Sequence, residues 1–184
     1  MTRGRWAALL LFAAAVALLP PAVRNPGPGA TEKLDEILAS RNDNDPRLDR
    51  DFLGLSAETK SLFRAKYRAL PPESRNERGT IVYLLGKNLK APEDWAFLRE
   101  VVAEPPCLSL SDCAKASAAG GEPGDEVTLA YPSLVALRQA HRAAREGGSR
   151  AEARTVLAAG KASSARAVVR LAASLDAGFD KKSP

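Results

Sequence analysis

This chain of 184 residues has very few of the side chains on which common enzyme motifs are built. It contains one histidine, His141, whereas a zinc-binding His-Glu-x-x-His motif needs two. The Gly-x-Ser-x-Gly turn of serine hydrolases does not occur, and Gly160-Lys161 is followed by alanine, which excludes a phosphate-binding loop. We therefore assign no catalytic residue and predict no cofactor. His141 lies on the apolar side of its predicted helix, and we interpret it as a structural residue.

Only two cysteines are present, Cys107 and Cys113, and their number limits what they can do. Structural zinc sites take four ligands, and no third cysteine or histidine lies nearby, so we expect no metal. The spacing is not the Cys-x-x-Cys of redox centres. In an oxidising compartment the pair can close a small loop and stabilise it by about 2 kcal/mol. We predict a disulfide between them, with two free thiols as the alternative.

Aromatic residues make up only 5% of the chain, and no convincing segment alternates apolar and polar residues as a half-buried strand does. The hydrophobic fraction of 45% is instead rich in alanine and leucine, which favour helix over sheet. We therefore predict an all-α fold.

The N-terminus holds one continuous apolar run, Trp6–Leu19, which follows Arg3 and Arg5 and is ended by Pro20. As a helix, its fourteen residues would span about 21 Å, less than the roughly 30 Å of a bilayer's hydrocarbon core. A positively charged start and a short apolar run are typical of a secretory signal.

These features divide the chain into four parts. Residues 1–23 are predicted to be a signal peptide or a membrane anchor, 24–30 a linker rich in proline and glycine, 31–179 a helical domain, and 180–184 a loose tail. We expect the protein to be exported, as a periplasmic or secreted protein. If the signal is not cleaved, residues 6–23 would anchor it in the inner membrane.

The net charge of +5 is distributed unevenly. Residues 31–58 carry eight acids and four bases, whereas residues 138–184 carry ten bases and four acids. Solvated helix faces account for such a pattern. The functional alternative is a basic face that binds an anionic partner, such as an anionic membrane surface. Its candidate residues are Arg138, Arg142, Arg145, Arg150 and Arg154. Nucleic acid is not an expected partner for an exported chain.

The segment 78–102 is the most informative part of the sequence, because its apolar residues follow the helical period on both sides of a sharp corner. Ser74 and Glu77 have the spacing of a capping box for the first helix, and Asn88 suits its C-terminal cap. Pro92 fits the first turn of a second helix, with acids directly after it. The short connection predicts two antiparallel neighbours.

Further helices are expected on both sides of this pair. On the N-terminal side the caps Thr31, Asp45 and Ser56 predict three starts, and we expect Leu62 among the inward residues of the third helix. Residues 104–125 are predicted to be an irregular loop with a short helix from about Asp112. The C-terminal helices are expected over about 125–145, with a start or kink at Pro132, from Ser149 to Gly160, and from about 163 to a stop at Gly178.

The helix pair resembles the repeats of HEAT-like or other α-solenoid proteins. The resemblance rests on Pro92, Trp95, Leu98, Val101 and Val102, which follow Leu84, Leu85 and Leu89. It covers about residues 45–176, and the pair at 127–159 is more loosely similar. The resemblance implies a stacked helical surface used for binding. A compact, irregular helical bundle is the alternative.

Three functional hypotheses follow from these patterns. The leading one is an exported, non-enzymatic helical protein that binds or scaffolds another envelope protein. The second is a carboxylate-based envelope hydrolase that acts on glycans and needs two acids facing each other across a cleft. The third is a membrane-tethered protein whose basic C-terminal face meets anionic lipid.

Overall fold

The structure, a computed structural model, describes residues 29–180. The predicted signal or anchor (1–23), most of the predicted linker and most of the predicted tail therefore lie outside the described residues. Within 29–180, no helix combines the length and the apolarity needed to cross a bilayer.

The described residues form helices and no strands, which confirms the all-α prediction. The helices are α1 (Gly29–Ser40), α2 (Arg47–Arg50), α3 (Ala57–Ala69), α4 (Arg75–Gly86), α5 (Pro92–Ala103), the 3-10 turn η1 (Ser117–Ala119), α6 (Glu126–Leu129), α7 (Tyr131–Arg145), α8 (Arg150–Lys161) and α9 (Arg166–Asp180).

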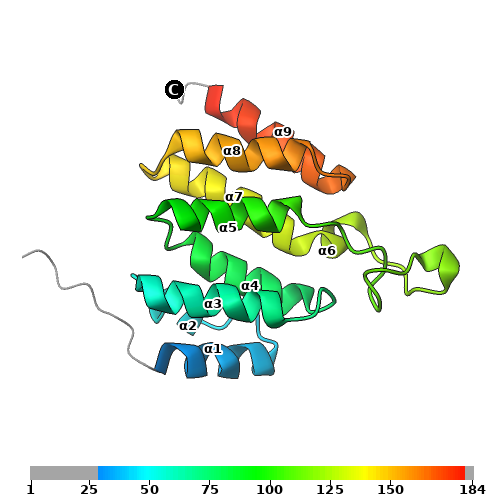
Figure 1. Ribbon diagram of the computed structural model, residues 1–184, viewed down its shortest axis with the longest axis horizontal. Coiled ribbons are helices and arrows are strands. Elements are labelled where there is room, and N and C mark those ends of the chain that lie inside the picture. Colours follow the sequence, from blue (N-terminus) through cyan, green and yellow to red (C-terminus); the bar gives the residue numbers. More distant parts are fainter. Residues whose placement is uncertain (1–28, 181–184) are drawn as a thin grey trace, which may run out of the picture.

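The helices stack from α1 at one end of the molecule to α9 at the other (Figure 1). In this stack α4 packs on α7 and α7 on α9, while α5 packs on α8. Helices α3 and α5 are bridged by Arg68, whose guanidinium donates two hydrogen bonds of 2.7 Å to the Glu100 carboxylate. The irregular segment 104–125 extends away from this stack, as Figure 1 shows.

Two glycines allow α4 to approach α7 closely. A Cβ added to Gly79 would lie 2.6 Å from Cδ1 of Tyr131, and one added to Gly86 would lie 2.5 Å from Cγ of Gln139. Both distances are far inside van der Waals contact, so only glycine fits at either position without a shift of its neighbour. Because position 79 meets 131 and position 86 meets 139, the two helices run parallel.

The core is continuous along the stack, from Leu34 in α1 to Phe179 in α9. Trp95 and Leu98 lie in it, in agreement with their interpretation as core residues. Phe63 and Tyr67 of α3 are fully buried, but the prediction for Leu62 was wrong, because its side chain is 51% exposed. Thr59 and Lys60 lie on the buried face of α3 instead.

Several predicted helix ends are confirmed. Pro92 lies in the first turn of α5, and the Asp94 carboxylate accepts a hydrogen bond of 3.0 Å from the Ala91 N–H. The Ser149 hydroxyl accepts one of 3.2 Å from the Glu152 N–H and caps α8. At Pro132 the chain begins α7 rather than kinking within a longer helix.

Other predicted ends were wrong. Ser74 makes no side-chain cap for α4. The segment after Asp112 forms only the 3-10 turn η1, and Gly178 does not stop α9, which continues to Asp180. Asn88 does cap the C-terminal end of α4, as predicted, since its side-chain amide donates a hydrogen bond of 2.8 Å to the Leu84 carbonyl, and the same buried side chain also bonds a distant segment.

A buried polar network, which we call the polar corner, closes the turn between α4 and α5. Its centre is the Asp94 carboxylate, 3% exposed, which forms an ion pair with the equally buried ammonium of Lys60 in α3. The Lys60 ammonium also donates to the Asn88 carbonyl at 3.2 Å. The Asn88 amide in turn donates to the Phe52 carbonyl at 2.9 Å and accepts from the Leu55 N–H at 3.0 Å. Three separate segments of chain therefore meet in one network, in which Lys60 links the Asp94 carboxylate to Asn88.

Asp94→Asn is expected to lower the free energy of unfolding by about 3 kcal/mol, because it leaves the buried Lys60 ammonium without its counter-charge. The matched control is Glu100→Gln, which removes an exposed ion pair between the same two helices and should cost less than about 1 kcal/mol. Denaturant unfolding of both variants measures the difference. Equal losses would contradict the central place of the polar corner.

The same carboxylate predicts a dependence of stability on pH. Burial raises the pKa of Asp94, but the Ala91 and Lys90 N–H groups and the Lys60 ammonium more than offset this, so that its pKa lies below the ordinary value of 3.8. A lowered pKa adds stability that is present above the unfolded-state pKa and is lost as pH falls through the folded-state pKa.

The stability gap between the wild-type protein and Asp94→Asn should therefore narrow as pH falls from 7 towards about 2, since a protonated aspartate resembles asparagine in charge. Denaturant midpoints measured across this range, wherever both proteins fold, test this. A gap that stays constant would show that the charge of Asp94 does not contribute.

Candidate functional site

The candidate site lies around the loop closed by Cys107 and Cys113. The two cysteines lie at disulfide distance, as the sequence predicts, with their Cα atoms 4.0 Å apart. Inside the loop, the Leu108 N–H donates to the Cys113 carbonyl at 3.0 Å, and the buried Ser109 hydroxyl donates to the Asp112 carbonyl at 2.7 Å. The loop is therefore a small, internally bonded unit.

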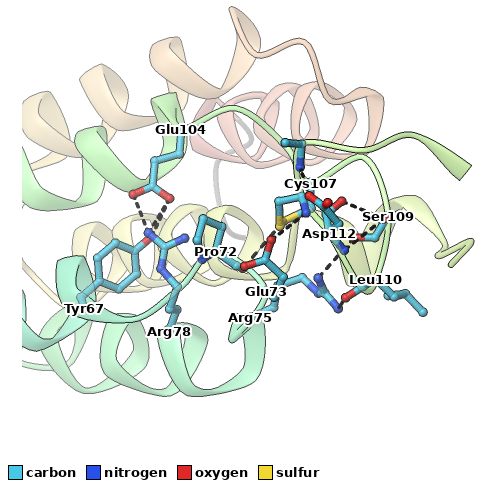
Figure 2. The surroundings of a disulfide bond; sticks show 12 residues. Tyr67, Pro72, Glu73, Arg75, Arg78, Glu104, Cys107, Ser109, Leu110 and Asp112 are labelled. Atoms are coloured by element: carbon cyan, nitrogen blue, oxygen red, sulfur yellow. Dashed lines mark hydrogen bonds and ion pairs between the residues drawn. A yellow bond between two sulfur atoms is a disulfide. The ribbon is translucent and has the colours of Figure 1, made fainter. Parts of the chain in front are cut away.

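The loop is held against the start of α4 by two side chains from the α3–α4 region (Figure 2). The Glu73 carboxylate accepts a hydrogen bond of 2.7 Å from the Cys113 N–H. The Arg75 guanidinium donates one of 3.0 Å to the Leu110 carbonyl. The hydrogen bond from the Cys113 N–H holds the pKa of Glu73 below its ordinary value. The carboxylate is thus suited to accept this bond at neutral pH.

Next to the loop, Figure 2 shows a second polar group, made of Tyr67, Arg78 and Glu104. One nitrogen of the Arg78 guanidinium lies 2.9 Å from both carboxylate oxygens of Glu104. The guanidinium carbon lies 4.1 Å above the centre of the Tyr67 ring, a cation–π contact. The Tyr67 hydroxyl donates to the same carboxylate at 2.9 Å. Burial, and then the Glu104 charge, raise the pKa of this hydroxyl well above its ordinary value.

These two polar groups border a groove of about 420 Å³, which we call the disulfide groove. This volume falls in the range of small-molecule and peptide-binding pockets. Prolines and small apolar residues dominate its lining. The groove is lined by Pro72, Glu73, Arg75, Arg78, Glu104, Pro105, Pro106, Cys107, Asp112, Cys113, Ala114, Leu129, Ala130, Pro132 and Ser133.

The acids of the groove bear on the hypothesis of a glycan hydrolase. Glycan hydrolysis by two carboxyl groups needs one whose pKa is raised, so that it can donate a proton at neutral pH. The pKa of Glu73, which lines the groove, is instead held below its ordinary value.

The five arginines of the predicted basic face have different surroundings. Arg138 lies exposed beside a second cavity on α7, and Arg142 lies 3.9 Å from Glu146. The guanidinium of Arg150 lies over the Phe179 ring, and Arg154 lies 3.9 Å from Asp176. Arg145 is exposed near His141. Binding of an anionic partner by these residues stays a prediction.

His141 is half-buried, as expected of a structural residue. Its ring stacks on the Phe179 ring of α9, with the centroids 4.8 Å apart. Burial, and then the Arg145 charge, lower the pKa of His141 below its ordinary value. The neutral imidazole is therefore favoured and acts as packing surface between α7 and α9.

Sequence reasoning found the two cysteines but not the groove beside them. Pro72 and Glu73 come from the α3–α4 turn, more than thirty residues before Cys107, and Pro132 comes from the start of α7, nineteen residues after Cys113. No local sequence pattern predicts that these segments lie close together. The paired prolines at 71–72 and 105–106 were a usable signal, because both flank the central helix pair.

Comparisons with known proteins provide no family or fold relationship for this chain: no family model matches it, nor does any curated protein or solved structure. Among residues 29–180, no group of three or more histidine, cysteine, aspartate or glutamate side chains is placed to hold a metal ion. The function is therefore argued from the groove itself.

Replacing both cysteines, as Cys107→Ser with Cys113→Ser, should release the loop without unfolding the helices. Closure of so short a loop stabilises it by about 2 kcal/mol, and the core of the stack lies elsewhere. Limited proteolysis should then cut the variant within residues 107–120 much faster than the oxidised wild-type protein, while the helical circular dichroism stays the same. Unchanged cleavage would show that Glu73 and Arg75 hold the loop without the disulfide.

Proposed function

We propose that this protein is an exported, non-enzymatic helical protein that binds or scaffolds another protein of the cell envelope, and that the disulfide groove holds a segment of that partner. The observation that carries the proposal is the groove: it is largely apolar, it is built before any partner arrives, and its charged groups are engaged in bonds within the protein.

The helix arrangement supports a binding scaffold of the HEAT-like type. Helices α4 and α5 form one antiparallel pair, since Arg78 at the start of α4 bonds Glu104 just after α5. Helices α7 and α8 form the next, and each helix of the first pair packs on its counterpart in the second. Such in-register stacking is the arrangement of solenoid repeats, which bind partners through their surfaces and the loops at the helix ends.

The lining of the groove fits a polypeptide segment better than a charged small molecule. Proline and leucine side chains provide contact area for an apolar residue. Glu73, Arg75 and Asp112 lie among the lining residues, and the oxygens and N–H groups that their internal bonds leave over suit the main-chain polar groups on either side of that residue. A rigid groove also costs little ordering entropy when it binds, because its shape does not have to form with the partner.

Export is supported by two features of the chain. The N-terminal run Trp6–Leu19 has the pattern of a secretory signal. The Cys107–Cys113 pair at disulfide distance suits an oxidising compartment such as the periplasm. We propose the periplasm or the cell exterior as the place of action, with anchoring by residues 6–23 as the alternative.

Ala114→Arg should abolish partner binding, because it places a large charged side chain into the disulfide groove. Ala116→Arg is the matched control: it adds the same side chain to the same loop, at an exposed position that does not line the groove. Affinity isolation of the full chain from envelope extracts, with quantitative mass spectrometry, should recover a partner at least tenfold less with Ala114→Arg than with Ala116→Arg. Equal recovery from both variants, or no reproducible partner with the wild-type chain, would contradict the proposal.

A further inference from the structure

A second cavity, of about 430 Å³, lies between the segment 43–49 and the helices α4 and α7. We call it the Tyr131 cavity. Its volume also falls in the range of small-ligand sites. It is lined by Asp43, Asn44, Asp45, Pro46, Leu48, Asp49, Gly79, Thr80, Tyr83, Tyr131, Val135, Arg138 and Gln139.

Two of the charged groups at this cavity have no partner of their own. Asp43 and Arg138 are both exposed, and neither forms an ion pair within residues 29–180. The other two acids are already engaged. Asp45 forms an ion pair with Arg47 at 2.8 Å, and Asp49 accepts hydrogen bonds from Tyr83 and Lys87. The cavity therefore offers one free negative and one free positive charge.

Gln139 supplies an independent sign of a ligand. Its side chain lines the cavity and is 7% exposed, yet its amide oxygen has no hydrogen-bond partner within the described protein. A buried amide oxygen without a partner costs free energy, and a polar group of a ligand would offset this cost. Since the carbonyl and NH₂ ends of an amide exchange by a half-turn, Gln139 can present either an acceptor or a donor to the cavity.

The ring of Tyr131 forms part of the cavity wall. The ring lies against Gly79, where no larger residue fits, so its position is fixed by the packing of α4 on α7. Burial, and then the Asp43 charge, raise the pKa of the Tyr131 hydroxyl, while the Arg138 charge opposes this rise. Both charges therefore act on the same phenol, one from the segment 43–49 and the other from α7.

A metal ion does not suit this set of groups. Two of its three carboxylates are already neutralised by bases, and an arginine repels a cation. A ligand that carries both charges suits it well: an ammonium group is attracted by Asp43, a carboxylate by Arg138, and the Gln139 amide adds a polar contact.

We propose that the Tyr131 cavity binds a small zwitterionic ligand of the amino-acid or short-peptide class, with its ammonium group at Asp43 and its carboxylate at Arg138. The cavity is separate from the disulfide groove, so the proposal does not depend on the protein partner proposed above.

The test is isothermal titration of the full chain with four probes. They are alanine, alanyl-alanine, N-acetyl-alanyl-alanine, which lacks the ammonium group, and alanyl-alanine amide, which lacks the carboxylate. We expect saturable binding of at least one of the first two probes, and the stronger of them identifies the source as a free amino acid or a peptide. Each masked dipeptide should bind at least about tenfold more weakly than alanyl-alanine, because one charged hydrogen bond is lost.

Three variants assign the contacts. Asp43→Asn and Arg138→Met should each weaken binding about tenfold or more, whereas Arg145→Met, an exposed arginine two turns further along α7, should leave it unchanged. Gln139→Met, which keeps the length of the side chain, should weaken binding while the melting temperature stays the same or rises, since the unpartnered buried oxygen is gone. A residue with a purely structural role would not separate binding from stability in this way.

Three results would overturn the proposal: the absence of saturable binding for both alanine and alanyl-alanine, a masked dipeptide that binds as tightly as an alanyl-alanine that does bind, or equal losses with Arg138→Met and Arg145→Met. None of these results bears on the disulfide groove, because Ala114 does not line the Tyr131 cavity.

Discussion

The packing of α3 against the turn between α4 and α5 depends on how the Asp94 carboxylate is neutralised. It accepts hydrogen bonds from the Lys90 and Ala91 N–H groups, and it pairs with Lys60 and Arg64 of α3. Removing such a charge from water is costly, and only a complete set of partners compensates for the cost. An arrangement in which α3 slides along α5 would leave an unpaired buried charge. The polar corner thus favours one register between these helices.

The opposite end of the same helix pair is fixed in a similar way, but with partners that reach the surface. There Arg78 joins the start of α4 to Glu104 after α5, and the Tyr67 ring of α3 lies under the guanidinium. With both ends determined, the chain that leaves α5 emerges at a defined point beside the α3–α4 turn. The disulfide and Glu73 then close a short irregular segment onto that point. The groove therefore depends on the two sets of polar contacts that fix the two ends of the α4–α5 pair.

The sequence was sufficient for the helical class and for those helix starts whose signals are local, such as Ser149 and Pro92. Prediction from the sequence failed where a contact between residues far apart in the chain determines which side chains are buried. Helical periodicity alone placed Leu62 inside and did not identify Lys60 as a buried residue, because the partner that makes burial of Lys60 favourable lies thirty-four residues away. Asn88 was predicted correctly as a cap of α4, but its further bonds to Phe52 and Leu55 could not be predicted for the same reason. The cysteine pair was predictable from its short spacing. The close approach of the proline-containing segments that line the groove was not.

The disulfide groove and the Tyr131 cavity are lined by consecutive residues of the chain, so a substitution at their common boundary can affect both. Arg78 lines the disulfide groove and Gly79, the next residue, lines the Tyr131 cavity; Tyr131 and Pro132 repeat this division on α7. A substitution at Gly79 would push the Tyr131 ring, because an added Cβ would lie 2.6 Å from it, and would move the start of α7 with it. Its effect would therefore reach both sites. Variants that change one side chain on one side of this boundary, such as Ala114→Arg or Arg138→Met, are the ones whose effects belong to a single site.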